Sequence, residues 1–324
     1  MSEKLNEIKT GVVGVGHMGK YHVNVLAGLN SSTHQLIGIY DVNKDNAQKI
    51  SEQYKVKNYE SLSQLLDDCD AVTIAVPTEH HYKIAIEAIN HGCHVLIEKP
   101  VTPKIEEAIE LIELAKKKKK ILQIGHVERF NGAVIEVQKI VDNPIYIETK
   151  RIAPFSPRIQ DAGVVLDMLI HDLDIVLNLV KSPVKDYYAV GQSLKGKHED
   201  IAVVTLKFEN NTMASLMASR VSQAKERKLF ITQEKSYIIL NYANQDIEIH
   251  KNASSANITM PDEIRYSQES YVENLFVHKD NPLKSEHIHF HKCIMGEADP
   301  IVSNEKDLET LRIALASIEM IKKR

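Results

Sequence analysis

Cysteine is scarce in this chain, and its three copies are scattered. Cys69, Cys93 and Cys293 form no C-x-x-C pair, which argues against a thiolate zinc site and against a framework of disulfide bonds. Such usage is typical of a reducing compartment, and we predict a cytoplasmic protein. Long apolar runs are also missing, because charges interrupt every hydrophobic stretch before it reaches the length of a signal peptide or a membrane helix.

An excess of charge of one sign is absent as well. The formal net charge is −4, so no general attraction to nucleic acid or to an acidic membrane is implied. The dense basic run Lys116–Lys120 closes a predicted amphipathic helix, where cations match the helix dipole and stay solvated. We therefore expect neither nucleic acid nor a membrane as a partner. The length of 324 residues favours two domains, since domains run to roughly 100–200 residues.

A glycine-rich turn organises the first half of the chain. Gly14, Gly16 and Gly19 form G-x-G-x-x-G between a short apolar strand at 10–15 and a helix. The first glycine allows the tight turn, the second lets the backbone approach a pyrophosphate, and the third lets the helix pack close to the sheet. The helix N-terminus adds free N–H groups and a positive dipole end. We predict dinucleotide binding, with a purely structural turn as the alternative. The predicted cofactor contacts here are Gly14, Gly16, His17, Met18 and Gly19.

A second strand, at 36–40, ends at Asp41. This aspartate follows Gly19 at about the 20-residue spacing expected of an acidic group on the adenosine ribose. A carboxylate there accepts hydrogen bonds from ribose hydroxyls and repels a 2′-phosphate, so NAD is expected rather than NADP. Lys44 keeps NADP open, and the structural alternative is a turn aspartate that caps the next helix.

Strands alternating with helices up to residue 125 predict an α/β Rossmann domain, a doubly wound parallel sheet. The run 71–76, AVTIAV, has the composition of a strand buried on both faces. Loops after such strands face the ligand crevice. The histidines of this region have no spacing that supports a metal site, and no metal is predicted. The crevice adds to the predicted cofactor site Val76, Pro77, Thr78, His81, Glu98 and Lys99.

Lys99 follows the strand at 94–97 and precedes a proline. Pro100 lacks a backbone donor and restricts Lys99 to an extended conformation, which holds an ammonium group in place at the crevice. A surface lysine in a turn is the alternative.

The pattern changes near residues 125–129. We predict three parts: a Rossmann domain at 1–125, an α+β domain at 126–303 with an open, mainly antiparallel sheet, and a helix at 304–324 that packs back on the first domain. Strand-like runs continue to residue 250, whereas the polar segment 251–270 is predicted to be a loop. The helix at 285–295 carries His287, His289 and His291, which we expect to be exposed or at an interface.

A largely apolar helix in the second domain carries Asp167 and His171. Residues four apart lie on one helix face, one turn from each other. Such a polar pair is unfavourable to bury without partners, and a histidine beside a carboxylate is suited to act as a general base. A helix cap or a satisfied core histidine is the alternative.

Together, the glycine turn, Asp41, Glu98-Lys99-Pro100 and the D-x-x-x-H helix resemble the family of glucose–fructose oxidoreductase, inositol dehydrogenase and rhizopine catabolism proteins. The resemblance extends over nearly the whole length and includes Arg129-Phe130-Asn131 and the tail 280–302. It implies hydride transfer between a nicotinamide and a sugar or cyclitol hydroxyl. It also implies that the Lys99–Pro100 bond is cis and that the sheet of the second domain serves oligomerisation, as a homodimer or homotetramer.

The resemblance assigns the chemistry to three residues. Lys99 would stabilise charge on the reacting oxygen, His171 would take the hydroxyl proton, and Asp167 would orient the substrate or the histidine. A base and a cation at one oxygen favour the departure of hydride.

A finer similarity, to bacterial UDP-N-acetylglucosamine 3-dehydrogenases, rests on the segment 151–158, RIAPFSPR, and the helix after it. It implies oxidation of the C3 hydroxyl to a ketone, which an aminotransferase converts to a 3-amino sugar for lipid A. Arg151 and Arg158 could bind a pyrophosphate bidentately. The alternative is that these arginines lie at the surface or in a dimer contact. The predicted substrate contacts are Lys99, Arg129, Arg151, Arg158, Asp167 and His171; His126 is a weaker candidate.

Two other functions remain open at this point. One is a dehydrogenase of a free sugar or cyclitol. The other is a nicotinamide-binding regulator without catalysis, against which the intact lysine and histidine argue.

Overall fold

The computed structural model describes residues 7–29, 31, 33–156, 162–260 and 263–323. The chain divides into two compact units, each built from two separate parts of the sequence. The first comprises Met1–Val127 and Asn281–Arg312, and the second comprises Glu128–Asp280 and Ile313–Arg324. The division after Val127 lies two residues from the predicted boundary. Residues 281–303, which the sequence pattern assigned to the second domain, belong instead to the first unit, and helix α9 (Asn304–Lys322) is shared between the two.

The first unit contains a six-stranded parallel sheet in the order β3-β2-β1-β4-β5-β6. This strand order is that of the Rossmann fold and confirms the predicted α/β class. Its central strands read as continuous apolar runs because both of their faces are buried. The strands are β1 (Ile8–Val13), β2 (His34–Tyr40), β3 (Lys57–Asn58), β4 (Ala71–Ile74), β5 (His94–Glu98) and β6 (Leu122–Gly125).

Local sequence explains where the helices of this unit begin and end. Asn43 and Ser61 accept hydrogen bonds from backbone N–H groups of the first turns that follow them. Asn281 caps α8, Pro282 follows where no N–H is needed, and Gly296 ends that helix in the left-handed region. The helical segments are α1 (Gly19–Leu29), α2 (Lys44–Tyr54), α3 (Leu62–Asp68), η1 (Thr78–His80), α4 (His81–Asn90), α5 (Ile105–Lys118) and α8 (Pro282–Met295).

Helix α8 belongs to the first unit because its inner face is buried there. Phe290 lies in an apolar cluster with residues of β1, β4 and β5. His287 and His291 are 0% and 8% exposed, so the expectation that they are exposed is wrong. His291 hydrogen-bonds Thr10 on β1 (3.2 Å), and its ring lies 4.0 Å from the ring of His34, centroid to centroid. The histidines are part of the packing of α8.

The second unit contains an eight-stranded sheet in the order β14-β13-β12-β11-β7-β10-β9-β8. The β7–β10 pair is parallel and the other pairs are antiparallel, which confirms the predicted α+β class. The strands are β7 (Tyr146–Ile152), β8 (Val184–Gln192), β9 (Ile201–Phe208), β10 (Met213–Ser219), β11 (Glu226–Thr232), β12 (Tyr237–Asn241), β13 (Asp246–Met260) and β14 (Glu263–Leu275).

One face of this sheet forms the core of the second unit. Alternate residues of the strands, such as Val204, Leu206 and Phe208, pack against α7 (Ile170–Leu179) and α6 (Gly132–Ile140). The second half of α9 adds Ile313 and Ala314 to the same cluster. A 3₁₀ turn η2 (Val127–Phe130) precedes α6, and a π-helical turn η3 (Val165–Leu169) precedes α7.

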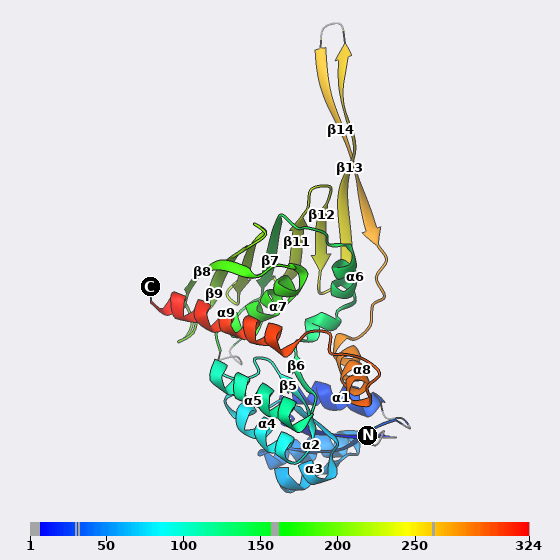
Figure 1. Cartoon of the computed structure of the whole chain (residues 1–324), viewed down its shortest axis with the longest axis vertical. Helices are drawn as coiled ribbons and strands as arrows, with labels where there is room; N and C mark the ends of the chain where they lie inside the picture. The colour runs from blue at the N-terminus through cyan, green and yellow to red at the C-terminus, as the bar shows by residue number, and fades with distance from the viewer. Residues whose placement is uncertain (1–6, 30, 32, 157–161, 261–262, 324) are drawn as a thin grey trace. The chain divides into compact units, whose positions relative to one another are not determined.

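The prediction of a loop at 251–270 is wrong. Residues 251–260 continue β13 and residues 263–270 form most of β14, and the two strands make a ribbon that extends past the ends of the neighbouring strands (Figure 1). Among the described residues, β13 pairs with β12 only up to His250, so the ribbon beyond that point has no third strand. The sequence of the segment is polar and lacks the alternation by which strands are recognised.

No helix within the described ranges has both the length and the apolar character needed to cross a bilayer.

We expect the first unit to lose stability as the pH falls from about 6.5, the ordinary pKa of histidine, toward about 4. Burial lowers the pKa of His34 to about 4 and that of His291 to about 3. In this window the unfolded chain binds protons that the folded chain does not, so the free energy of unfolding decreases as the pH falls. Urea unfolding at a series of pH values measures the effect.

The matched variant is His34→Asn, which removes one titrating ring. Its unfolding midpoint should depend less steeply on pH across this window than that of the wild type. An identical slope in the two proteins would contradict the assignment of the effect to His34.

Candidate functional site

The glycine turn between β1 and α1 has the geometry that the motif predicts. Gly14 has φ +83°, and a Cβ on it would lie 2.6 Å from a methyl group of Val76. A Cβ on Gly19 would lie 1.9 Å from the carbonyl oxygen of Gly14, so no other residue fits. At Gly16 a Cβ would meet no atom within 4 Å, and the residue is exposed. The turn is thus closed on the protein side and open on the side where a ligand would bind.

Asp41 is tied to this turn by its carboxylate. Oδ2 accepts a hydrogen bond from the backbone N–H of Val15 (2.7 Å), and Oδ1 accepts one from Asn43 (2.8 Å). Asn43, not Asp41, caps α2, since its side chain accepts from the N–H of Asn46. The Asn46 amide in turn donates to the carbonyl of Val15 (2.8 Å). The carboxylate is therefore held beside the glycine turn, as an acidic partner of an adenosine ribose would have to be.

These residues fit a bound dinucleotide. The turn is open at Gly16, α1 begins at Gly19 with its N-terminal dipole end at the turn, and an acidic side chain lies beside it. His17 and Met18 are exposed in the same turn. The predicted contacts of these residues with a cofactor stay predictions.

His81 connects two segments that border the predicted crevice. Its ring nitrogens lie 2.9 Å from the carbonyl oxygen of Val76 and 3.0 Å from that of Pro100. Burial lowers the pKa of His81, although both backbone contacts oppose the shift. The imidazole thus lies between the segment after β4, next to Pro77 and Thr78, and the Lys99–Pro100 turn. A neutral imidazole has one N–H, so it donates to one of these two carbonyls at a time.

Lys99 lies directly after β5, half-buried, and its peptide bond to Pro100 is cis, as the family resemblance implied. The backbone N–H of Lys99 donates to Oε2 of Glu98 (3.2 Å). Glu98 is 8% exposed, and its Oε1 accepts a hydrogen bond from Nε2 of His22 (2.9 Å). Burial alone raises the pKa of Glu98, but the His22 bond and the charge of Lys99 outweigh it and hold that pKa below its usual value. A carboxylate, not a carboxylic acid, therefore supports the lysine turn.

Asp167 and His171 belong to the second unit, and both are half-buried. Asp167 lies in the π-helical turn η3, and His171 is the second residue of α7. The expected regular helix is therefore interrupted between them, and the prediction that the pair lies one α-helical turn apart on one face needs this correction. π-helical turns inside helices are frequent at functional sites.

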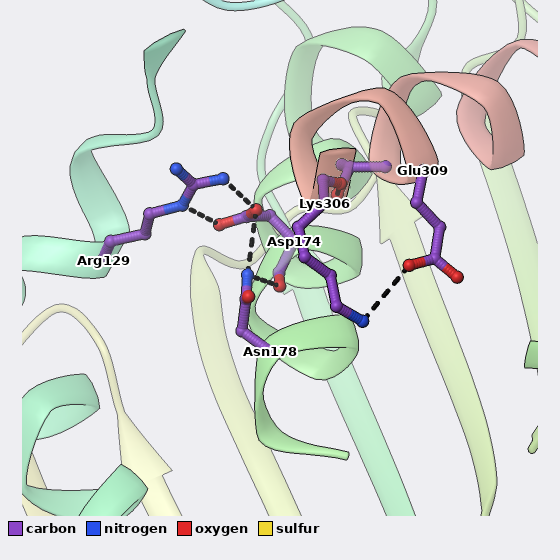
Figure 2. A network of polar contacts seen from close by, with 6 residues as sticks. Arg129, Asp174, Asn178, Lys306 and Glu309 are labelled. Atoms are coloured by element: carbon purple, nitrogen blue, oxygen red, sulfur yellow. Dashed lines mark hydrogen bonds and ion pairs between the residues drawn. The ribbon is translucent and has the colours of Figure 1, made fainter. Parts of the chain in front are cut away.

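Arg129 and Asp174 form a buried ion pair in the second unit (Figure 2). Nε and Nη2 of the arginine donate to the two carboxylate oxygens at 2.8 and 2.5 Å. The amide of Asn178 donates to the carbonyl and the carboxylate of the same aspartate. This bidentate geometry holds the guanidinium in place.

Arg151 is engaged in the same way. Its Nε and Nη2 donate to Asp172 (2.8 and 2.9 Å), and Nη1 donates to Glu128 (3.0 Å). Its guanidinium carbon also lies 4.9 Å from the ring centroid of Tyr242. Burial alone lowers the pKa of Arg151, but the carboxylate charges outweigh it and raise that pKa. Arg151 is 3% exposed, so the alternative of a surface arginine does not apply. Arg158 lies outside the described residues.

Comparison with known proteins supports one family. A model described as "Oxidoreductase family, NAD-binding Rossmann fold" matches residues 8–126, and a GFO/IDH/MocA C-terminal domain matches residues 130–239. The UDP-N-acetylglucosamine 3-dehydrogenase of Acidithiobacillus ferrooxidans is 35% identical over 75% of this chain and 77% of its own. This chain belongs to the GFO/IDH/MocA oxidoreductase family.

Other relatives show how wide the family is. The scyllo-inositol 2-dehydrogenase (NAD(+)) of Bacillus subtilis is 25% identical over 96% of this chain and 93% of its own. A solved structure of the Acidithiobacillus enzyme superposes with a TM-score of 0.89 at 30% identity, with 98% of each chain covered. Membership makes this protein an oxidoreductase of a family of sugar and cyclitol dehydrogenases and supports a nicotinamide cofactor. The roles of Lys99, Asp167 and His171 stay predictions.

Sequence reasoning missed two polar residues of the first unit, His22 and His287. His22 was not among the predicted site residues, and the structure buries it completely. His287 gave no local signal, because its partner is 265 residues away.

Proposed function

We propose that this protein oxidises the C3 hydroxyl of UDP-N-acetylglucosamine to the 3-keto sugar with NAD. The observation that carries the proposal is the 35% identity to the Acidithiobacillus UDP-N-acetylglucosamine 3-dehydrogenase over three quarters of the chain. The agreement of the two folds over 98% of both chains supports it. Lys99 and His171, which the proposed chemistry needs, are both present and half-buried.

In this proposal the substrate loses a hydride from C3 and a proton from its hydroxyl. A nicotinamide cofactor held at the glycine turn and Asp41 would supply the acceptor for this hydride. Lys99 donates a hydrogen bond to the reacting oxygen and stabilises the negative charge that grows there. His171 takes the hydroxyl proton as general base, and Asp167 orients the histidine or the sugar. The buried Glu98 carboxylate holds the backbone of Lys99, which reduces the freedom of the turn.

The arginines have separate parts in the proposal. Arg158 would pair with the diphosphate of a UDP-sugar. Arg129 and Arg151 are each paired bidentately with a carboxylate. They would therefore support the shape of the substrate site and would not themselves bind the diphosphate. The product, a 3-ketone, suits an aminotransferase that forms a 3-amino sugar, as lipid A synthesis would require. We place the protein in the cytoplasm, where nucleotide sugars are made.

A second candidate is a dehydrogenase of a free sugar or cyclitol, which the inositol dehydrogenase relatives favour. A non-catalytic NAD-binding regulator is a third. The three differ in what they turn over, so one assay separates them.

Pure protein incubated with NAD and UDP-N-acetylglucosamine should give absorbance of the reduced nicotinamide, with a coupled aminotransferase to remove the ketone. Lys99→Ala and His171→Ala should each lower kcat by at least about 100-fold, since both act on the reacting oxygen. Turnover of inositol or glucose with no response to UDP-sugars would support the second candidate. Cofactor binding without turnover of any sugar would support the regulator.

Asp41→Ala should reduce the preference for NAD over NADP by about tenfold or more, because the carboxylate that accepts ribose hydrogen bonds and repels a 2′-phosphate is lost. Titration of both reduced cofactors by fluorescence measures the two dissociation constants. Unchanged relative affinities would mean that Asp41 only braces the glycine turn. Asp45→Ala, which removes a nearby carboxylate on α2, is the control.

We also propose that the protein assembles as a homodimer or homotetramer through the sheet face opposite α7. Side chains that alternate with the buried ones are large and exposed there, an arrangement common at interfaces. They are Tyr188, Val190, Met213, Tyr237 and Val272.

Light scattering should therefore give a multiple of the chain mass of 36.6 kDa. Val190→Lys with Met213→Lys should shift the mass toward one chain, because two charges would be buried in the interface. Val42→Lys, at an exposed position of the first unit, is the control. A wild-type mass of one chain at micromolar concentration would contradict the assembly.

A further inference from the structure

Three buried side chains of the first unit form a continuous hydrogen-bonded chain that ends at the lysine turn. Oε1 of Glu98 lies 2.9 Å from Nε2 of His22, and Nδ1 of His22 lies 2.8 Å from Nε2 of His287. His22 and His287 are both 0% exposed. The three residues come from β5, α1 and α8, so one polar chain crosses three elements.

The partners determine which nitrogens carry protons. An ionised carboxylate only accepts, so Nε2–H of His22 donates to Glu98. One proton between Nδ1 of His22 and Nε2 of His287 makes the second hydrogen bond of the chain. Burial holds the pKa of His287 well below its usual value, which keeps this ring neutral as the pattern requires. Such a carboxylate–histidine chain fixes both the tautomer and the orientation of the imidazole.

The far end of the chain reaches the backbone of Lys99. The second carboxylate oxygen of Glu98 accepts the backbone N–H of Lys99 (3.2 Å). On the other side of the turn, the carbonyl of Pro100 lies 3.0 Å from Nδ1 of His81. The backbone N–H of the lysine is therefore held by Glu98, and on the other side of the turn the carbonyl of Pro100 lies beside the buried ring of His81.

We propose that Glu98, His22 and His287 are positioning residues for the oxidation, which set the place of the Lys99 ammonium group relative to the reacting hydroxyl. This inference rests on the proposed role of Lys99. His22 lies in the first turn of α1, whose N-terminus meets the glycine turn. The hydrogen-bonded chain therefore connects the lysine to the helix that is predicted to bind the cofactor. Helix α8 supplies the last link, although its residues lie far in the sequence from every predicted site residue.

Helix α8 also carries a residue that serves as a matched control. His291 lies one turn from His287, is 8% exposed, and hydrogen-bonds Thr10 instead of the Glu98 chain. Replacing either histidine removes a buried ring from the same face of α8. Only the change at His287 removes a member of the hydrogen-bonded chain that leads to Lys99.

The experiment compares wild type, Glu98→Gln, His287→Asn, His291→Asn and Lys99→Ala. The glutamine of the Glu98→Gln variant keeps the size of the side chain, but its single amide oxygen cannot replace two carboxylate oxygens that accept from His22 and from the Lys99 N–H. For each protein, kcat and the KM for the sugar are measured at saturating NAD. The dissociation constant of the reduced cofactor and the thermal midpoint are measured separately. A carbon-13 methyl label on the lysines, assigned with Lys99→Ala, reports the environment of Lys99 without turnover.

We expect Glu98→Gln and His287→Asn to lower kcat by about 10- to 100-fold, the effect of a small misplacement of a catalytic group. The KM should change by less than about threefold in both variants, and so should the cofactor dissociation constant in His287→Asn, because His287 is not a predicted cofactor contact. The Lys99 resonance should shift in both variants. His291→Asn should lower the thermal midpoint and leave kcat and this resonance as in the wild type.

Equal losses of kcat in His287→Asn and His291→Asn would overturn the inference, since they would show a structural role. So would an unchanged kcat and an unmoved Lys99 resonance in Glu98→Gln and His287→Asn. If no sugar is turned over by the wild type, the proposed function fails. The Lys99 resonance then still decides whether the histidine chain positions the lysine.

Discussion

The close approach of Gly19 to the carbonyl oxygen of Gly14 is the constraint on which the first unit depends. Because a Cβ would lie 1.9 Å from that oxygen, the start of α1 can pack against the turn only as bare backbone. This contact sets the direction of α1, and with it the position of His22 three residues later. In the same turn, the N–H of Val15 donates to Asp41. The packing of α1 on this turn therefore lies between the acidic side chain on the predicted cofactor side and the histidine that leads to Lys99.

Much of the first unit was predictable because its signals are local. Strands buried on both faces, such as β4 and β5, are read from short apolar runs. The glycine turn and Asp41 have a spacing that the strand–turn–helix geometry imposes. Lys99 was predicted to follow a buried strand and precede a proline, and it does lie directly after β5, while its role stays a prediction. In each case the physical cause lies within a few residues of the feature it explains.

The features that were missed depend on distant partners or on backbone detail. A histidine is usually predicted to lie at the surface. His287 and His291 are buried because α8 packs against residues of α1, β1 and β2, which are far away in the sequence. Beyond His250 the ribbon of β13 and β14 pairs with no third strand among the described residues, and its polar sequence carries no apolar alternation. The π-helical turn at Asp167 has i→i+5 hydrogen bonds in place of the i→i+4 bonds of an α-helix, which the spacing of residues in the sequence does not reveal. The role of Arg151 as a buried ion-pair member also required its three-dimensional neighbours.

Residues 281–312 belong to the first unit although they follow most of the second unit in the sequence. This affects the order in which the two units are completed during synthesis. A ribosome releases the glycine turn and the parallel strands first, then most of the second unit, and only afterwards α8. Until then the faces of α1 and β1 that receive His287 and Phe290 have no cover. The N-terminal unit of this protein is therefore the first to be started and among the last to be completed during synthesis.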